Sequence, residues 1–329
     1  MSQSVVPLPF ILRRIHSLLG LWLVIFLIEH LLVNSQLALF FGEKETGFIH
    51  LVNTIHALPY LPFIEWTLIG VPLIAHGLWG LHYLAGSYLR GGRSDGSRPL
   101  IPSNGRNRAY YWQRIASLIL GVGLILHVGK FRFLTYPASL HQGSANYYAI
   151  TVPADPKLYF LAEEIGVKLF SPSQIEELKA TLLSENSKRH LEEVVKTYPP
   201  DSSDSSILIS SVRELENNQN TQELISFLEA QKQAPHELVA LGSQMGQVTL
   251  LSVRETFKTI FTAICYTAFV LAACFHAFNG LWTFLITWGV ILKVSAQKMA
   301  LIVTWSLMGT ITLLGMMAIW GTYYFNLTG

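Results

Sequence analysis

The sequence predicts an all-α membrane protein, a bundle of five transmembrane helices with a helical extracytoplasmic insert between the third and the fourth. Two observations carry this prediction. Of the 329 residues, 51% are hydrophobic and only 13% are charged, which is the composition of a membrane protein rather than of a soluble enzyme. Five stretches also hold the roughly 20 mainly apolar residues that a membrane-spanning helix needs.

Short loops join the predicted spans, except after the third, where a long polar segment follows. The second and fourth spans are longer than a bilayer requires, so we expect them to tilt, overhang or break. No cleavage site of small residues follows the first apolar run, which favours an uncleaved span over a signal peptide. We therefore divide the chain into residues 1–131, with three spans, an insert at 132–255, and residues 256–329, with two. The predicted spans are Ile15–Phe41, Tyr60–Leu89, Ala109–Val128, Phe257–Leu292 and Met299–Phe325.

Lysine and arginine gather in alternate loops, and basic loops of this kind stay on the cytoplasmic side of a membrane. Arg13 and Arg14 precede the first span, five arginines lie between the second and third, and Lys293 and Lys298 lie between the fourth and fifth. The loop after the first span has only Lys44, between two glutamates. The pattern predicts a multi-pass protein of a bacterial inner membrane, with a cytoplasmic N-terminus and with the insert and the C-terminus outside.

The insert is the acidic part of the chain, because residues 140–255 hold 9 Lys and Arg against 16 Asp and Glu. Three stretches in it have the spacing of amphipathic helices with charged outer faces, and a linker rich in Pro and Ser lies at Tyr198–Ser206. No cluster of its residues suggests chemistry, so we expect a small, mostly helical domain. The helical stretches are Ser173–Ser184, Lys188–Lys196 and Thr221–Gln233.

Other motifs that would indicate a function do not occur in the sequence. Cys265 and Cys274 lie in one apolar stretch and predict neither a disulfide framework nor a zinc site. There is no phosphate loop and no dinucleotide-binding glycine motif. Nothing in the sequence predicts binding to nucleic acid.

Four of the 11 histidines lie in four different predicted spans, at His30, His76, His127 and His276. Ionisable groups in a span are costly and mark functional sites. A low-spin b-type haem takes two axial imidazoles, usually from different helices of a bundle, so these histidines predict two bis-histidine haems inside the bundle. Without a CxxCH motif, the haems are expected to be bound non-covalently. A pathway for protons or metal ions is the alternative use of the same histidines.

Helical phase separates His16 from the four predicted ligands. It is 14 residues from His30, which places the two within about 40° of one face but ~21 Å apart along the axis. They cannot therefore bind one iron, and His16 is expected at the cytoplasmic mouth of the bundle. Haem propionates would meet cations and hydrogen-bond donors there. The candidate residues for the propionates are Arg14, His16, Ser17, Arg114 and Lys293.

Glu65 lies at the predicted outer end of the second span, eleven residues before His76 and within ~20° of the same face. His50 and His56, in the preceding loop, are candidates to meet it there. An acid and histidines at a membrane surface can deliver protons to a reduced quinone, although a solvated loop explains them equally well. Glu29, about 100° from His30, is a candidate proton relay or a partner for a basic residue.

Four long stretches resemble the ligand helices of the succinate dehydrogenase cytochrome b558 subunit, a five-helix, two-haem, single-chain membrane anchor also found in some fumarate reductases. The resemblance covers about 200 of the 329 residues, with the stretches in the same order. Three of the histidines also have a glycine four residues away, at Gly80, Gly123 and Gly280. Small residues there would make room for a porphyrin against the helix, although they are also common at packed transmembrane interfaces in general. The stretches are RRIHSLLG…FLIEHLLVN (13–34), PLIAHGLWG (72–80), WQRIASLILGVGLILHV (112–128) and FHAFNGLWTFLITWG (275–289).

The resemblance implies that His76 and His276 hold the haem nearer the cytoplasm, and that His30 and His127 hold the outer one. It also implies two partner subunits, an iron–sulfur protein and a flavoprotein that oxidises succinate, with electrons passing through both haems to a quinone, usually menaquinone. The insert has no counterpart in the family. The alternatives are a cytochrome b of another dehydrogenase, of the hydrogenase or formate type, and a histidine-lined transporter of protons or metal ions.

Overall fold

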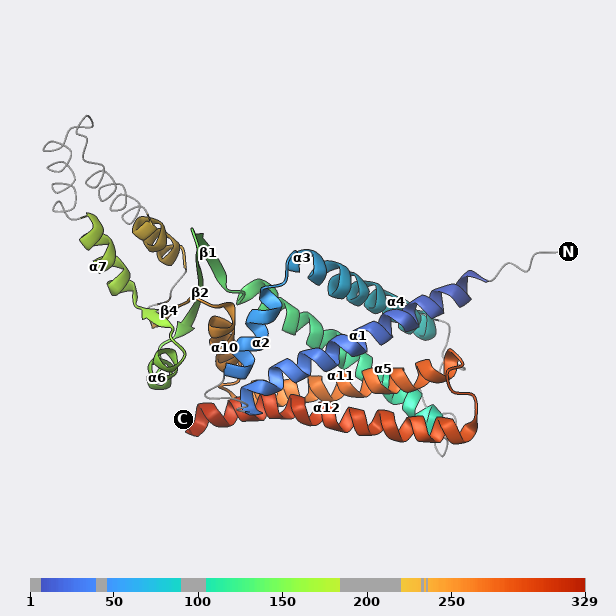
Figure 1. The fold of residues 1–329 in the computed structure, drawn as a ribbon. Coiled ribbons are helices and arrows are strands. Elements are labelled where there is room, and N and C mark those ends of the chain that lie inside the picture. The colour runs from blue at the N-terminus through green and yellow to red at the C-terminus, as the bar shows by residue number, and fades with distance from the viewer. Residues whose placement is uncertain are drawn as a thin grey trace, which may run out of the picture. The chain divides into compact units, whose positions relative to one another are not determined.

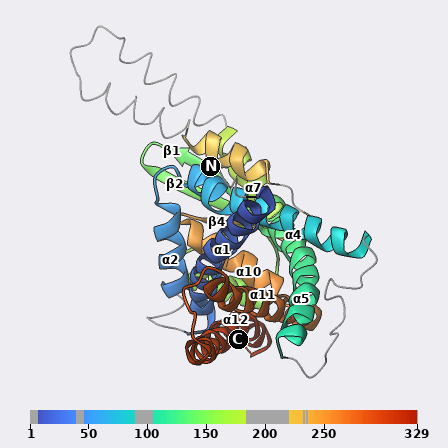
Figure 2. The same cartoon turned by 90° about the vertical axis from the view of Figure 1, so that its right-hand side faces the viewer.

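The computed structural model describes residues 7–39, 46–89, 105–183, 220–231, 234 and 236–328. The chain divides into two compact units (Figures 1 and 2). The first comprises Met1–Leu134 and Thr256–Gly329, and the second comprises Thr135–Glu255. The predicted stretch Lys188–Lys196 and the linker Tyr198–Ser206 lie outside the described residues.

Long apolar helices make up the first unit, and five of them are long and apolar enough to cross a membrane, as the sequence predicted. Each apolar run forms one helix because a helix satisfies its own backbone hydrogen bonds, which lipid cannot do. Between the first two spans lies a shorter helix, α2 (Thr46–His56). The spans are formed by α1 (Leu8–Leu39), α3 (Leu61–Ile64) with η1 (Glu65–Gly70) and α4 (Val71–Leu89), α5 (Gly105–Val128) with η2 (Gly129–Leu134), α11 (Ile260–Thr287) and α12 (Val294–Thr328).

Helices α1, α11 and α12 run beside one another and form the centre of this unit (Figure 1). Helix α4 packs on α1, and α5 packs on α11. Small residues allow the close approach that holds transmembrane helices together. At Gly315 of α12, for example, an added Cβ would lie 2.7 Å from the side chain of Val270 on α11 and 3.4 Å from that of Leu31 on α1.

Two segments of π-helix interrupt the spans, and they alter the geometry expected from an α-helix. The second span, predicted to tilt, overhang or break, contains η1 between α3 and α4. A π-helix bonds residue i to i+5 and turns less per residue than an α-helix. The predicted ~20° between Glu65 and His76 assumed α-helix throughout, so it does not describe this span. The second π-segment, η2, extends α5 as far as Leu134.

The second unit contains a four-stranded antiparallel sheet, so the all-α prediction is wrong for this part of the chain. Its strand order is β1-β2-β4-β3. The central strands carry the short apolar runs YYAITV and LVAL, rich in β-branched and aromatic residues, which are too short for periodicity to separate strand from helix. The strands are β1 (Ala138–Gln142), β2 (Ala145–Pro153), β3 (Lys168–Phe170) and β4 (Glu237–Gly242).

Helices still account for more of the described residues of this unit than strands do. Two of the predicted helices are present, Ser173–Ser184 as α7 (Pro172–Leu183) and Thr221–Gln233 as a helix at residues 220–229. Two further helices are α6 (Pro156–Glu164) and α10 (Met245–Thr256).

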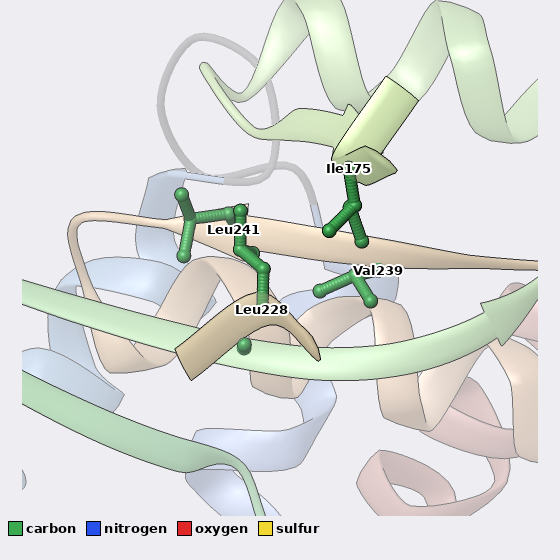
Figure 3. Close-up of a cluster of buried hydrophobic side chains, with 5 residues drawn as sticks. Ile175, Leu228, Val239 and Leu241 are labelled. Carbon is green, nitrogen blue, oxygen red and sulfur yellow. The ribbon is translucent and has the colours of Figure 1, made fainter. Parts of the chain in front are cut away.

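An apolar core and a buried ion pair hold the second unit together. The core joins the sheet to its helices through Ile175 of α7, Leu228, and Val239 and Leu241 of β4 (Figure 3).

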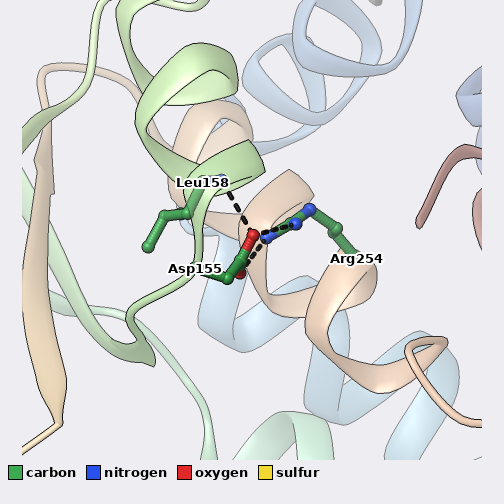
Figure 4. A network of polar contacts seen from close by, with 3 residues as sticks. All are labelled: Asp155, Leu158 and Arg254. Atoms are coloured by element: carbon green, nitrogen blue, oxygen red, sulfur yellow. Dashed lines mark hydrogen bonds and ion pairs between the residues drawn. The ribbon is translucent and has the colours of Figure 1, made fainter. Parts of the chain in front are cut away.

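The ion pair joins Asp155, the N-cap of α6, to Arg254 of α10 (Figure 4). One carboxylate oxygen accepts from the Leu158 backbone N–H at 3.0 Å, and both oxygens accept from the Arg254 guanidinium at 2.8 and 3.0 Å. Paired N–H···O bonds of this kind are among the strongest in proteins.

Candidate functional site

The four histidines predicted as ligands form two facing pairs within the first unit. His30 of α1 faces His127 of α5, with ring centroids 5.7 Å apart and ring planes at 85°. His76 of α4 faces His276 of α11, with centroids 6.2 Å apart and planes at 89°. The residue spacing alone left the pairing open, and the structure joins the same partners that the family resemblance implied.

Aromatic rings enclose the His127 side of the first pair. The rings of Phe131, Tyr266 and Phe269 have their centroids 5.1 to 5.9 Å from that of His127. The Tyr266 hydroxyl lies 3.4 Å from Nδ1 of His127 and is its polar neighbour. Gly123, one turn before His127, faces the ring of Phe269, which leaves no room for a Cβ. This glycine therefore serves close helix packing, the alternative that the sequence had left open for it.

His30 lies between an aromatic ring and an amide on its own helix. The Phe26 ring lies one turn before it, with the centroids 5.5 Å apart. One turn after it, the Asn34 amide donates to the His30 carbonyl at 2.8 Å. Glu29, the adjacent residue, is exposed on α1.

In the second pair, the protonation of His76 follows from its neighbour. The Nδ1 atom of His76 lies 3.0 Å from the backbone carbonyl of His16. A carbonyl only accepts hydrogen bonds, so Nδ1 carries the hydrogen and Nε2 of a neutral ring keeps its lone pair. A second partner that fixes the tautomer and the ring orientation in this way is the usual support of a metal-binding histidine.

His16 is in direct contact with His76. The two rings stack with centroids 4.0 Å apart and planes within 8°. Gly20, one turn further along α1, makes room for His76, since an added Cβ would lie 2.9 Å from its Cε1. The structure thus places the His16 ring flat against a predicted ligand, and its proposed contact with a propionate stays a prediction.

Two polar side chains that sequence reasoning missed support His276. Gln113 of α5 donates to the His276 carbonyl at 3.0 Å and accepts from the Asn279 amide at 2.8 Å. Asn279 is buried, and Gln113 is half-buried. The signal was present in the sequence, because uncharged amides within apolar spans are also rare and need partners. Nδ1 of His276 is buried and has no hydrogen-bond partner within the described parts of the chain.

Near the N-terminal end of α1, two of the residues predicted to bind propionates meet the C-terminal end of α11. Arg14 donates to the Thr287 carbonyl at 2.6 Å, and its guanidinium lies 5.0 Å above the Trp288 ring. Ser17 accepts from the Trp288 indole N–H at 3.1 Å. Arg114 lies on α5, and Lys293 is exposed in the turn after α11.

The predicted quinone group is only partly brought together. The Glu65 carboxylate of η1 pairs with Arg132 of η2 at 3.0 Å, and both charges act on the ring of His56, the last residue of α2. Burial lowers the pKa of His56, Glu65 raises it, and Arg132 lowers it. His50 is exposed and lies six residues earlier, about 240° around the helix from His56. Sequence reasoning missed Arg132, which lies just beyond the predicted end of the third span.

The two pairs fit a group with two axial ligands. Metal–imidazole bonds are about 2 Å long, so imidazoles on opposite sides of one ion have ring centroids roughly 6 Å apart. Both observed separations are close to this value. In the described residues, no three or more His, Cys, Asp or Glu side chains form a cluster that could hold a bare metal ion. Pairs suit a macrocycle, which supplies the other ligands itself.

One curated protein is similar to part of this chain. The succinate dehydrogenase cytochrome b558 subunit of Bacillus subtilis (strain 168) is 31% identical over 124 residues, 37% of this chain. The chain spans about half the length of that relative, 55% of its residues. No protein-family profile matches the chain, and comparison with the solved structures found no match. The five apolar helices support a multi-pass membrane protein.

Proposed function

We propose that this chain is the membrane-anchor cytochrome b subunit of a succinate:quinone oxidoreductase. The observation that carries the proposal is the pairing of four histidines from four spans into two facing sets. Two haems b would be held there, by His76 with His276 nearer the cytoplasm and by His30 with His127 nearer the outer surface. Each bound haem supplies a centre that accepts and releases one electron. The chain therefore carries electrons and reduces quinone, while succinate is oxidised on another subunit.

The residues of the chain orient the ligands and exclude water. The His16 carbonyl holds the hydrogen of His76 on Nδ1, so Nε2 keeps the lone pair that would bind the iron. Gln113 ties the backbone at His276 to α5. Around His127, the aromatic rings of Phe131 and Phe269 keep water from the outer pair. Apolar surroundings and fixed hydrogen bonds are the means by which a protein sets the potential of a haem.

Basic and polar side chains near the N-terminal end of α1 could bind the carboxylates of the inner haem. Arg14 is held in place by the Thr287 carbonyl and the Trp288 ring, beside Ser17. Arg114 and Lys293 are further candidates at the ends of their helices. The basic loops on the same side would also suit docking of the iron–sulfur subunit, which in turn binds the flavoprotein.

A quinone, usually menaquinone in the proteins this chain resembles, is expected near the outer pair. Its two-electron reduction takes up two protons, and Glu65 with His56 lies at that end of the second and third spans. The outer histidine pair would hold the haem that supplies the electrons. Quinone reduction would then take place in this subunit.

A visible difference spectrum tests the proposal. The chain, extracted gently with its partners, is expected to show reduced b-type bands and two haems per chain. The matched variants H76Q and H127Q should each retain one haem, whereas H82Q, which changes an exposed histidine on the same helix as His76, should retain both. A chain without b-type bands would favour the transporter. Co-purification with a hydrogenase or formate dehydrogenase in place of a flavoprotein would assign it to another complex.

A further inference from the structure

An ion pair between two π-helical segments stands at the predicted quinone end of the bundle. Glu65 is the first residue of η1, and Arg132 lies in the last turn of η2. The 3.0 Å contact joins the second span to the third, which come from separate parts of the sequence. The two side chains are 32% and 37% exposed, so the pair lies at the edge of the unit, within reach of a ligand.

The π-helical geometry makes this placement possible. A π-segment adds one residue to a turn and is found frequently at functional sites. η1 is also fixed to α1, because the indole N–H of Trp22 donates to the Leu68 carbonyl at 2.5 Å. In η2, Lys130 has its ammonium group over the Phe131 ring at 5.7 Å. The guanidinium of Arg132 is the cation that η2 offers to Glu65.

His56 is the third group of the cluster and is half-buried at the end of α2. Burial lowers its pKa, and the charges of Glu65 and Arg132 act on it in opposite directions. Helix α1, which packs on α2, carries Glu29 and His30 as the titratable groups of its second half. While Glu65 and Arg132 are paired, the rise that Glu65 causes in the pKa of His56 is opposed by the fall that Arg132 causes.

We infer that Arg132 is the positioning residue of the quinone site: its ion pair holds the Glu65 carboxylate, and His56 is left as the side chain that gives a proton to the bound quinone. This inference rests on the proposed function. In the reaction, the quinone would accept two electrons, which come from succinate through the partner subunits, and two protons, one from His56 and the other from water. The imidazole then recovers its proton from water, so the site returns to its first state.

The pH dependence of quinone reduction in the intact complex tests the inference. A proton donor is active in its protonated form, so activity falls as the pH rises through the apparent pKa of His56. This fall in activity is the alkaline limb of the pH profile. R132Q leaves the Glu65 charge unopposed, which raises the pKa of His56, and is expected to move the limb to higher pH. E65Q leaves the Arg132 charge unopposed and should move it to lower pH. The double variant E65Q/R132Q and the conservative variant R132K should both return the limb close to its original position.

Two controls separate this inference from the proposed function and from loss of structure. Haem content and succinate oxidation with an artificial acceptor should be unchanged in all these variants, because neither needs the quinone. H56Q should remove the alkaline limb of the pH profile.

The role of Arg132 is refuted if R132Q and E65Q keep both haems but leave the limb in place, or move it in the same direction. The proposed function would still stand after either result. If R132Q does not assemble, E65Q and R132K still decide the direction. A wild-type chain without haem refutes the proposed function itself.

Discussion

The Nδ1 atom of His76 donates a hydrogen bond to the backbone carbonyl of His16, 3.0 Å away, while the two imidazole rings stack 4.0 Å apart. One residue of α1 thus supports a predicted ligand in two ways, through its main chain and through its ring. A substitution of the His16 side chain removes the stacked ring but keeps the backbone carbonyl and its hydrogen bond.

Substitution H16A should leave both haems in place, whereas H76A should lose one. Alanine keeps the carbonyl that fixes the tautomer of His76, and the orientation of Nε2 depends on that bond. The loss of the stacked ring should shift the midpoint potential of the inner haem without changing the haem count. Redox titration of the visible spectrum measures both quantities. If H16A loses a haem as completely as H76A does, the histidine ring itself would be needed for binding.

Gly20 and Gly77 form a matched pair for testing the space around His76. An added Cβ at Gly20 would lie 2.9 Å from Cε1 of His76 and 3.4 Å from its Nδ1, whereas at Gly77 it would meet nothing within 4 Å. G20A should therefore displace the His76 ring and reduce binding of the inner haem, and G77A should not. Both replacements favour the helix by a similar amount, about 1 kcal/mol, so that effect cancels. Equal haem occupancy in the two variants would show that the ring can move away without loss.

Gln113 and Asn279 are expected to act as one unit that supports His276. Q113A removes the bond to the His276 carbonyl and also leaves the buried Asn279 amide without its acceptor. Leaving a buried polar group unsatisfied costs about 1–3 kcal/mol, which should lower the thermal midpoint of haem release. The double variant Q113A/N279A should cost less than the sum of the single variants, because they share one bond. Additive costs would mean that the two amides act independently.

The bundle could be predicted from the sequence because its signal is long and repeated. Twenty apolar residues in a row have few ways to satisfy their backbone in lipid, so all five spans were predicted, with ends that differ from the observed ones by up to seven residues. The sheet of the second unit has a weaker signal. The runs at Ala145–Pro153 and Glu237–Gly242 are short, and they pair across more than 80 residues of sequence, which no local pattern reveals.

At the candidate site, the sequence singled out the histidines that the structure brings together, but not the contacts that surround them. Single histidines in apolar helices are conspicuous, and all four lie in the facing pairs. The ion pair of Glu65 with Arg132 depends on two π-segments, whose phase no fixed angle per residue describes. The carbonyl contact of His76 depends on the backbone of another helix. Such details arise only when the helices pack.

The ion pair of Asp155 and Arg254 should hold the second unit together. Arg254 is 4% exposed, and its partner also caps α6. Removing one member of a fully buried pair costs about 3–5 kcal/mol; Asp155 is 24% exposed, so R254M should cost less than this but still loosen α6 and α10. Hydrogen exchange on the full chain, followed by mass spectrometry, should show faster exchange in these two helices and unchanged exchange in α11. The control D155N/R254M removes both charges and should recover part of the protection, because neither partner is then left charged and buried. Exchange in R254M that matches the unsubstituted chain would show that the apolar core around Val239 suffices without the pair.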